Sequence, residues 1–199
     1  MPDMKRSLAP TLREFLKNKI ILLMGPRQVG KTTLAKSLEK SPAYYNYDIK
    51  KDLRVFMDQE WDSAPPLVIF DELHKMRKWK TWLKGLYDEG RFEKQAVVVT
   101  GSARLDFARR VGDSLAGRFY SFRLHPLDLK ELKGTGTLEE IYTRLLKLSG
   151  FPEPYLGGSD RLAGLWRKTH LDVIIRQDLL TQESVKDLDG IELLVELLA

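Results

Sequence analysis

Apolar residues gather along this chain in short uninterrupted runs, each followed by a glycine, an acidic pair or a polar turn. Three runs read IILLM at residues 20–24, LVIF at 67–70 and AVVV at 96–99. A run that is apolar at every position is typical of a strand covered on both faces in a parallel sheet. We predict these three strands, and two more at 44–49 and 118–124.

Helical periodicity fills the gaps between the predicted strands. Residues 8–16 and 31–39 carry apolar side chains at helical spacing, and residues 79–87 carry a stripe made by Trp79, Trp82, Leu83, Leu86 and Tyr87. One such face packs on a sheet. Strands that alternate with helices predict an α/β domain with a parallel sheet and right-handed crossovers.

The pattern changes after Pro126. Two long helices are expected at 138–148 and 160–180, separated by the polar and glycine-rich residues 149–154 and 157–158. We therefore expect an α/β core at residues 1–128 and a helical region at 129–199.

A glycine-rich segment follows the first predicted strand and begins the next helix. It matches G-x-x-x-x-G-K-[ST], and its residues are Gly25, Pro26, Arg27, Gln28, Val29, Gly30, Lys31 and Thr32. In this context the glycines let backbone N–H groups wrap around phosphate oxygens. Lys31 is expected to reach the β- and γ-phosphates and Thr32 to ligate Mg²⁺. Thr33 is expected near the α-phosphate.

Two acidic residues, Asp71 and Glu72, close the third predicted strand. Ligands of parallel sheets bind outside the carboxyl ends of the strands, so this pair is expected to face the phosphates. Asp71 suits the metal contact of a Walker-B aspartate, and Glu72 suits a general base for water. His74 is either a nucleotide sensor or, as we favour, part of a solvated basic face.

The fourth and fifth strands offer two further candidates. Ser102, or failing that Thr100, ends the fourth strand, where a hydroxyl can hold the attacking water. Arg118 precedes the fifth strand and is an arginine-finger candidate, in its own subunit or a neighbouring one. The residues that compete with Arg118 for this role are Arg104, Arg109 and Arg110.

In these blocks the chain resembles prokaryotic AAA-like P-loop ATPases that carry a DUF4143-type carboxy-terminal domain. The matching blocks are GPRQVGKTTL, FDE, TGS, SLAGR and GFPE, in that order. The resemblance implies a P-loop NTPase three-layer α/β/α fold, sheet order 5-1-4-3-2, a helical lid and a winged-helix-like region. It also implies ATP as ligand and ADP as product. The chain departs from the family at Ala103, where relatives have serine, and it is expected to end before the last domain is complete.

Composition narrows the remaining choices. The chain has no Cys, which excludes thiolate chemistry and disulfides, and no apolar run of the ~20 residues that a bilayer span needs. We expect a cytoplasmic protein. Net charge +5 permits an anionic partner. A slow, regulated ATPase that depends on a protein partner or a homo-oligomer fits best, with a nucleic-acid-binding ATPase or a small-molecule kinase as the alternatives.

Overall fold

The computed structural model describes residues 4–102, 115, 117–174, 190, 194 and 197. The chain divides into two compact units, Met1–Lys133 and Gly134–Ala199. Within the first unit, Glu131 accepts hydrogen bonds from Arg6 and from Ser7.

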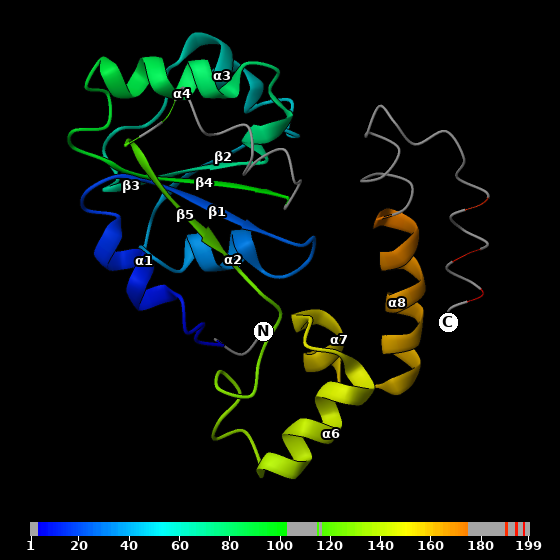
Figure 1. The fold of residues 1–199 in the computed structure, drawn as a ribbon. Helices are drawn as coiled ribbons and strands as arrows, with labels where there is room; N and C mark the ends of the chain where they lie inside the picture. Colours follow the sequence, from blue (N-terminus) through cyan, green and yellow to red (C-terminus); the bar gives the residue numbers. More distant parts are fainter. Residues whose placement is uncertain are drawn as a thin grey trace. The chain divides into compact units, whose positions relative to one another are not determined.

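Five parallel strands form one sheet in the described part of the first unit (Figure 1). They are β1 (Ile20–Gly25), β2 (Ala43–Asn46), β3 (Leu67–Asp71), β4 (Ala96–Ser102) and β5 (Phe119–Arg123). Their spatial order is β2-β3-β4-β1-β5, and every neighbouring pair is parallel. The expected α/β fold and the order 5-1-4-3-2 are confirmed.

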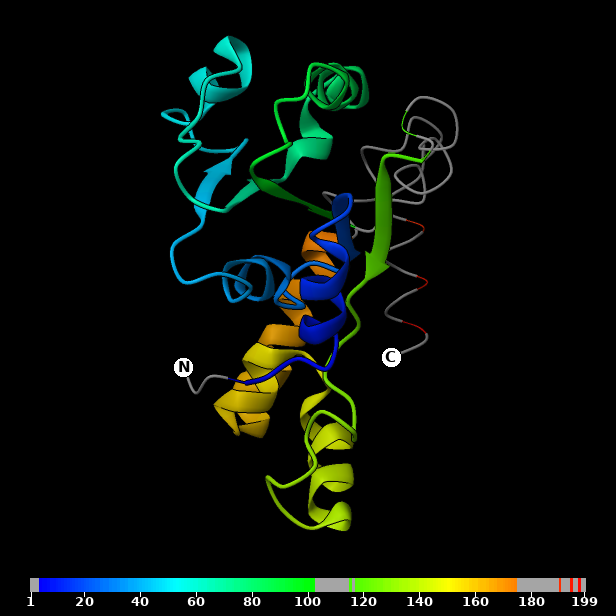
Figure 2. The ribbon, with the colours of Figure 1, turned by 90° about the vertical axis from the view of Figure 1, so that its left-hand side faces the viewer.

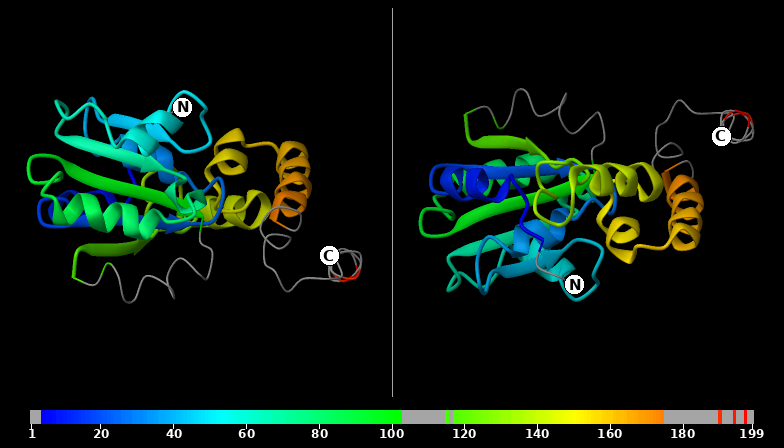
Figure 3. Two further views of the ribbon diagram at one scale, coloured as in Figure 1. Left: turned by 90° about the horizontal axis from the view of Figure 1, so that it is seen from above. Right: turned by 90° about the horizontal axis from the view of Figure 1, so that it is seen from below.

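Short helices cover both faces of this sheet. On one face lie α1 (Ala9–Phe15) and α2 (Lys31–Lys36), and on the other α3 (Leu53–Asp58) and α4 (Trp79–Asp88) (Figures 1 and 2). The view from above shows α3 and α4 in front of the strands, and the view from below shows α1 and α2 in front of them (Figure 3). A one-turn helix, η1 (Leu73–Lys75), follows β3.

Strands β1 and β3 are buried along their whole length. Every residue of β1 and of β3 is buried, as the uninterrupted apolar runs predict. Trp79 and Trp82 of α4 are 7% and 9% exposed and belong to the core that packs on Phe70. Trp82 satisfies its indole N–H by donating to the Phe56 carbonyl at 3.0 Å. The apolar stripe of this helix therefore packs on the sheet, as expected.

The second unit is helical in the residues described. It contains α6 (Leu138–Leu148), α7 (Pro152–Gly157) and α8 (Asp160–Val173). A capping box of Thr137 and Glu140 begins α6, and the hydrogen bonds from Thr137 lower the pKa of Glu140. The sequence interpretation read residues 149–154 as a separator, but α7 begins there, because proline is tolerated at a first helical position.

No helix in the described ranges is long and apolar enough to cross a membrane. The expected helix at 160–180 is observed as far as Val173, with Ile174 as its C-cap, and residues 175–180 lie outside the described ranges.

Candidate nucleotide-binding site

The turn between β1 and α2 depends on two glycines. A Cβ on Gly25 would lie 2.4 Å from the carbonyl oxygen of Leu124, so a side chain is excluded by close backbone approach. Gly30 caps α2 with φ 95°, a left-handed conformation that favours glycine. The chain thus passes from strand to helix within residues 26–29, as a phosphate-binding loop requires.

Lys31 is buried at the start of α2, with its ammonium group against the loop. Nζ donates to the carbonyl oxygens of Gly25 at 3.0 Å and Pro26 at 2.7 Å. A buried ammonium within a turn rich in backbone N–H groups is suited to bind an anion. Of the other predicted loop residues, Val29 is buried, Pro26, Arg27 and Thr32 are half-buried, and Gln28 and Thr33 are exposed.

Asp71 lies at the carboxyl end of β3 and accepts four hydrogen bonds. Its Oδ2 accepts from the hydroxyls of Thr32 at 2.8 Å and Tyr44 at 2.7 Å. Its Oδ1 accepts from the Thr100 hydroxyl and from the Glu72 backbone N–H at 3.1 Å. A carboxylate can only accept hydrogen bonds, so the Thr32 hydroxyl donates its proton to Asp71. The lone pairs of that hydroxyl remain available to another ligand.

Tyr44 was not among the site residues predicted from the sequence. Asn46 is the β2 residue paired with Asp71, and Tyr44 precedes it by two, so Tyr44 and Asp71 share a face of the sheet. Burial, followed by the hydrogen bond to Asp71, raises the pKa of Tyr44 to about 12. Side chains alternate between the two faces of the sheet along residues 44–46, and this could have indicated that Tyr44 lies on the same face as Asp71. The inference requires the register of β2 against β3.

Glu72 adopts an unusual backbone conformation beside Asp71. Its φ of 56° is left-handed, which is uncommon for a residue with a side chain and is often found at functional sites. Among the described residues its buried Oε2 has no hydrogen-bond partner, yet it lies 3.5 Å from Lys75 Nζ and 3.7 Å from His74 Nε2. Two cationic or potentially cationic groups therefore face this carboxylate.

His74 does not belong to a solvated basic face, and that expectation is wrong. Its side chain is 4% exposed, and a Cβ on Gly101 would lie 2.8 Å from its Nδ1. His74 therefore packs directly against the backbone of β4, between the sheet and Glu72. The cause is η1, which turns the chain back over the carboxyl edge immediately after β3.

The two hydroxyl candidates of β4 differ in what the structure shows. Thr100 is fully buried and its hydroxyl binds Asp71. Ser102 pairs with Gly25 through the strand register, which places its backbone beside the start of the loop, and its side chain lies outside the described structure. A sensor role for Ser102 stays a prediction. Ala103, Arg104, Arg109 and Arg110 also lie outside the described ranges.

Arg118 is not brought together with the other predicted residues. It precedes β5, which runs parallel to β1, so it lies at the amino edge of the sheet, opposite the loop. A strand of this length separates the edges by roughly 17 Å. Its Nε donates to Asp88 Oδ1 at 2.7 Å. This position argues against a role at its own subunit's phosphates and leaves the neighbouring subunit as the remaining hypothesis.

The donor set around Asp71 fits Mg²⁺ held jointly with phosphates. Thr32 and Asp71 offer hard oxygen ligands, which Mg²⁺ prefers. Within the described residues no group of three or more His, Asp or Glu side chains could hold a metal alone. Mg²⁺ commonly binds proteins through one or two such groups, with substrate phosphates completing its shell.

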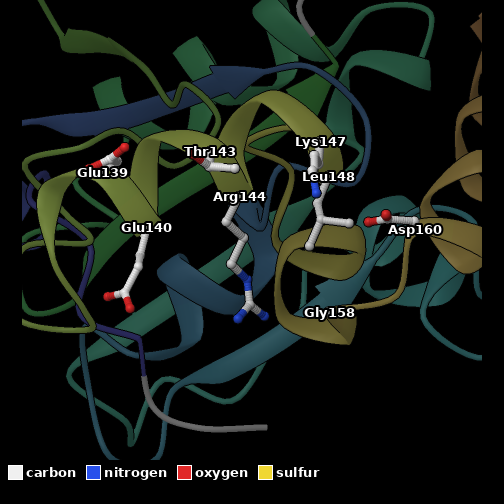
Figure 4. A pocket seen from close by; sticks show the side chains of 8 residues that line it. All are labelled: Glu139, Glu140, Thr143, Arg144, Lys147, Leu148, Gly158 and Asp160. Carbon is white, nitrogen blue, oxygen red and sulfur yellow. The ribbon is translucent and has the colours of Figure 1, made fainter.

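A separate cavity of about 380 Å³ lies in the second unit (Figure 4). Its polar groups already serve the helices: Arg144 donates to the carbonyl of Tyr155 at 2.6 Å, and Glu140 caps α6. The lining residues are Glu139, Glu140, Thr143, Arg144, Lys147, Leu148, Gly158 and Asp160.

The amino-acid sequence is similar to that of known proteins over much of the chain. An uncharacterized protein of Methanocaldococcus jannaschii is 23% identical over 93% of this chain and 47% of its own length. A second, from Mycobacterium tuberculosis, is 26% identical over 88% of this chain and 40% of its own length. The chain thus spans less than half of these curated relatives.

The fold is that of P-loop NTPases. The structure of AMPPCP-bound DnaA from Aquifex aeolicus aligns with a TM-score of 0.54 and 15% identity, over 89% of this chain and 67% of that one. Residues 17–133, more than half of the chain, match the family described as AAA domain. This chain belongs to the AAA domain family.

Proposed function

We propose that this chain is a Mg²⁺-dependent ATP-binding protein and a slow, regulated ATPase. The observation that carries the proposal is the contact of Thr32 with Asp71 beside the buried ammonium of Lys31. These groups come from a glycine-bounded turn and the end of a buried strand, at one edge of the sheet. The fold neighbour DnaA, whose structure holds the ATP analogue AMPPCP, supports ATP as the ligand.

Each side chain has a separate task in this proposal. Lys31 and the backbone of residues 25–30 would bind phosphate, and Thr32 and Asp71 would hold Mg²⁺. Mg²⁺ would neutralise charge on the transferred phosphoryl group. Glu72 orients the attacking water and accepts its proton.

The surroundings of Glu72 support regulated turnover. Lys75 and His74 lie 3.5 and 3.7 Å from its Oε2, and contacts this close restrain the carboxylate. Lys75 also pairs with Asp48, which follows β2. A protein partner or a second copy that displaced Lys75 would release Glu72, which gives regulation a physical basis.

Nucleotide titration tests the binding half of the proposal. A fluorescent ATP analogue is titrated against wild type and Lys31→Ala, with and without Mg²⁺, and GTP is the competitor. We expect saturable, Mg²⁺-dependent binding that Lys31→Ala abolishes. Binding that survives Lys31→Ala would refute the site.

Phosphate release tests hydrolysis. Wild type should release phosphate slowly, and Glu72→Gln should still bind nucleotide but release none. Equal rates for the two proteins would exclude Glu72 as the base. An ADP yield that requires an added acceptor would instead favour the kinase alternative, which AAA family membership disfavours.

A nucleic-acid-binding ATPase is the second candidate, favoured by exposed cations at the same edge of the sheet. They follow β2 and β3 and are Lys50, Lys51, Arg54, Lys75, Arg77 and Lys78. Trp79 and Trp82, which lie in the same basic stretch, are core residues and cannot stack on bases. Binding would therefore rest on phosphate contacts.

Salt dependence discriminates this candidate. Phosphate contacts release counterions, so affinity for a fluorescent single-stranded oligonucleotide should fall steeply between 50 and 200 mM salt, by about 10³-fold or more for six contacts. A Lys50→Gln/Lys51→Gln variant should show a shallower slope. No binding at 50 mM salt would eliminate the candidate.

A further inference from the structure

Three adjacent strands converge on one carboxylate. Asp71 ends the middle strand β3, Tyr44 comes from β2 on one side and Thr100 from β4 on the other. Tyr44 and Thr32 share Oδ2, whereas Thr100 and a backbone N–H hold Oδ1. The carboxylate is thus fixed at both oxygens by groups from both neighbouring strands.

We infer that Tyr44 is a positioning residue for the metal site: its hydroxyl fixes the Asp71 oxygen against which Thr32 is oriented. Both Thr32 and Tyr44 donate to that oxygen, so its position decides where the lone pairs of Thr32 are directed. The inference rests on the proposed function, since it concerns the metal that accompanies the nucleotide.

Tyr44 is itself held in the donating orientation. Asn46 donates its Nδ2–H to the Tyr44 hydroxyl at 3.1 Å. The hydroxyl carries one proton, and because it accepts from Asn46 that proton is directed to Asp71. The ammonium of Lys36 lies 3.5 Å from the centre of the Tyr44 ring, a cation–π contact that fixes the ring.

The neighbouring residue Tyr45 provides a matched comparison. It lies on the same strand with its side chain on the opposite face, and its ring stacks on Phe70 in the core. Its hydroxyl accepts from the backbone N–H of Asp62 at 3.0 Å, away from Asp71. Replacing either tyrosine by phenylalanine removes one hydroxyl from β2, but only at Tyr44 does that hydroxyl hold the carboxylate.

The test compares wild type, Tyr44→Phe and Tyr45→Phe in the full chain. Affinity for a fluorescent ATP analogue is measured in EDTA, and Mn²⁺ binding to the nucleotide complex is measured by electron paramagnetic resonance. Loss of an outer-shell partner weakens metal binding by 10–100-fold in many proteins, and we expect about tenfold for Tyr44→Phe. Its affinity in EDTA should stay within about twofold, and Tyr45→Phe should match wild type in Mn²⁺ affinity.

Each outcome has a definite meaning. Selective loss of Mn²⁺ affinity in Tyr44→Phe supports the inference. Mn²⁺ affinity within twofold of wild type overturns it, as does an equal loss of nucleotide affinity in EDTA, which would mean that the hydroxyl only maintains the fold. If wild type binds no nucleotide in either condition, the proposed function fails and the inference with it.

Discussion

Arg6 contacts three segments around the turn between β1 and α2, and its removal should be strongly destabilising. Its guanidinium pairs with Glu131 at 3.1 Å and donates to the carbonyl of Val29 at 2.9 Å and to that of His125. The two charged side chains are 8% and 4% exposed. This ion pair therefore joins the amino-terminal segment, the loop and the residues after β5.

The expected magnitudes follow from the burial of both charges. Breaking a buried ion pair costs about 3–5 kcal/mol, because the remaining charge is left uncompensated. Ser7 still donates twice to Glu131, so we take about 3 kcal/mol for Arg6→Met, and a similar value for Glu131→Leu. The double variant leaves no buried charge and should lose only about 3 kcal/mol, which gives a coupling energy of about 3 kcal/mol.

Urea unfolding measures this cycle. Trp61, Trp79 and Trp82 lie in the first unit, so fluorescence in a Trp166→Phe background reports that unit. With a slope of about 2 kcal/mol/M, each single change should lower the midpoint by about 1.5 M. If the losses of the two single variants add to within about 0.5 kcal/mol in the double variant, the ion pair is not energetically coupled and the reasoning fails.

Three further predictions concern the site. Burial and Asp71 raise the pKa of Tyr44 from 10 to about 12. The protonated hydroxyl therefore contributes its full stabilisation of the fold below pH 10 and loses it as pH rises toward 12. The difference in urea midpoint between wild type and Tyr44→Phe should then shrink as pH rises from 10 to 12, and a constant difference would contradict this. Thr100→Val should lose about 1.5–3 kcal/mol of stability. Thr100→Ser should lose less, because serine retains the hydroxyl that donates to Asp71. A lower urea midpoint for Thr100→Ser than for Thr100→Val would refute this hydrogen bond. Arg118→Ala should bind nucleotide normally yet hydrolyse it slowly, and mixing it with Glu72→Gln should restore phosphate release if the arginine acts between subunits. No recovery on mixing would count against that role.

The buried strands and the glycine-bounded turn after β1 could be predicted because their signals are local. An apolar run such as residues 20–24 followed by a glycine-rich turn specifies a buried strand and its loop without knowledge of distant residues. The position of Asp71 followed from the rule that parallel strands present their carboxyl ends together. Sheet order came from the family resemblance, not from the residues.

The partners of those residues depend on pairings that the sequence does not encode locally. Tyr44 reaches Asp71 only in the observed register of β2 against β3, and a shift by one residue would move it to the other face. His74 looked like a member of a charged run, but the one-turn helix after β3 buries it against Gly101. Arg118 was chosen because it belongs to the segment SLAGR. The direction of β5, which runs parallel to β1, determines which edge of the sheet it occupies.

The two adjacent carboxylates differ in ways that match different tasks. Asp71 is 3% exposed, and four hydrogen bonds hold its two oxygens in place. Within the described structure, Oε2 of Glu72 accepts no hydrogen bond. It lies 3.5 Å from Lys75 Nζ and 3.7 Å from His74 Nε2. A base needs a lone pair that no hydrogen bond occupies, and a group that orients a metal ligand needs rigidity. The environment of each carboxylate, and not only its place in the motif, therefore supports Asp71 as the positioning group and Glu72 as the base.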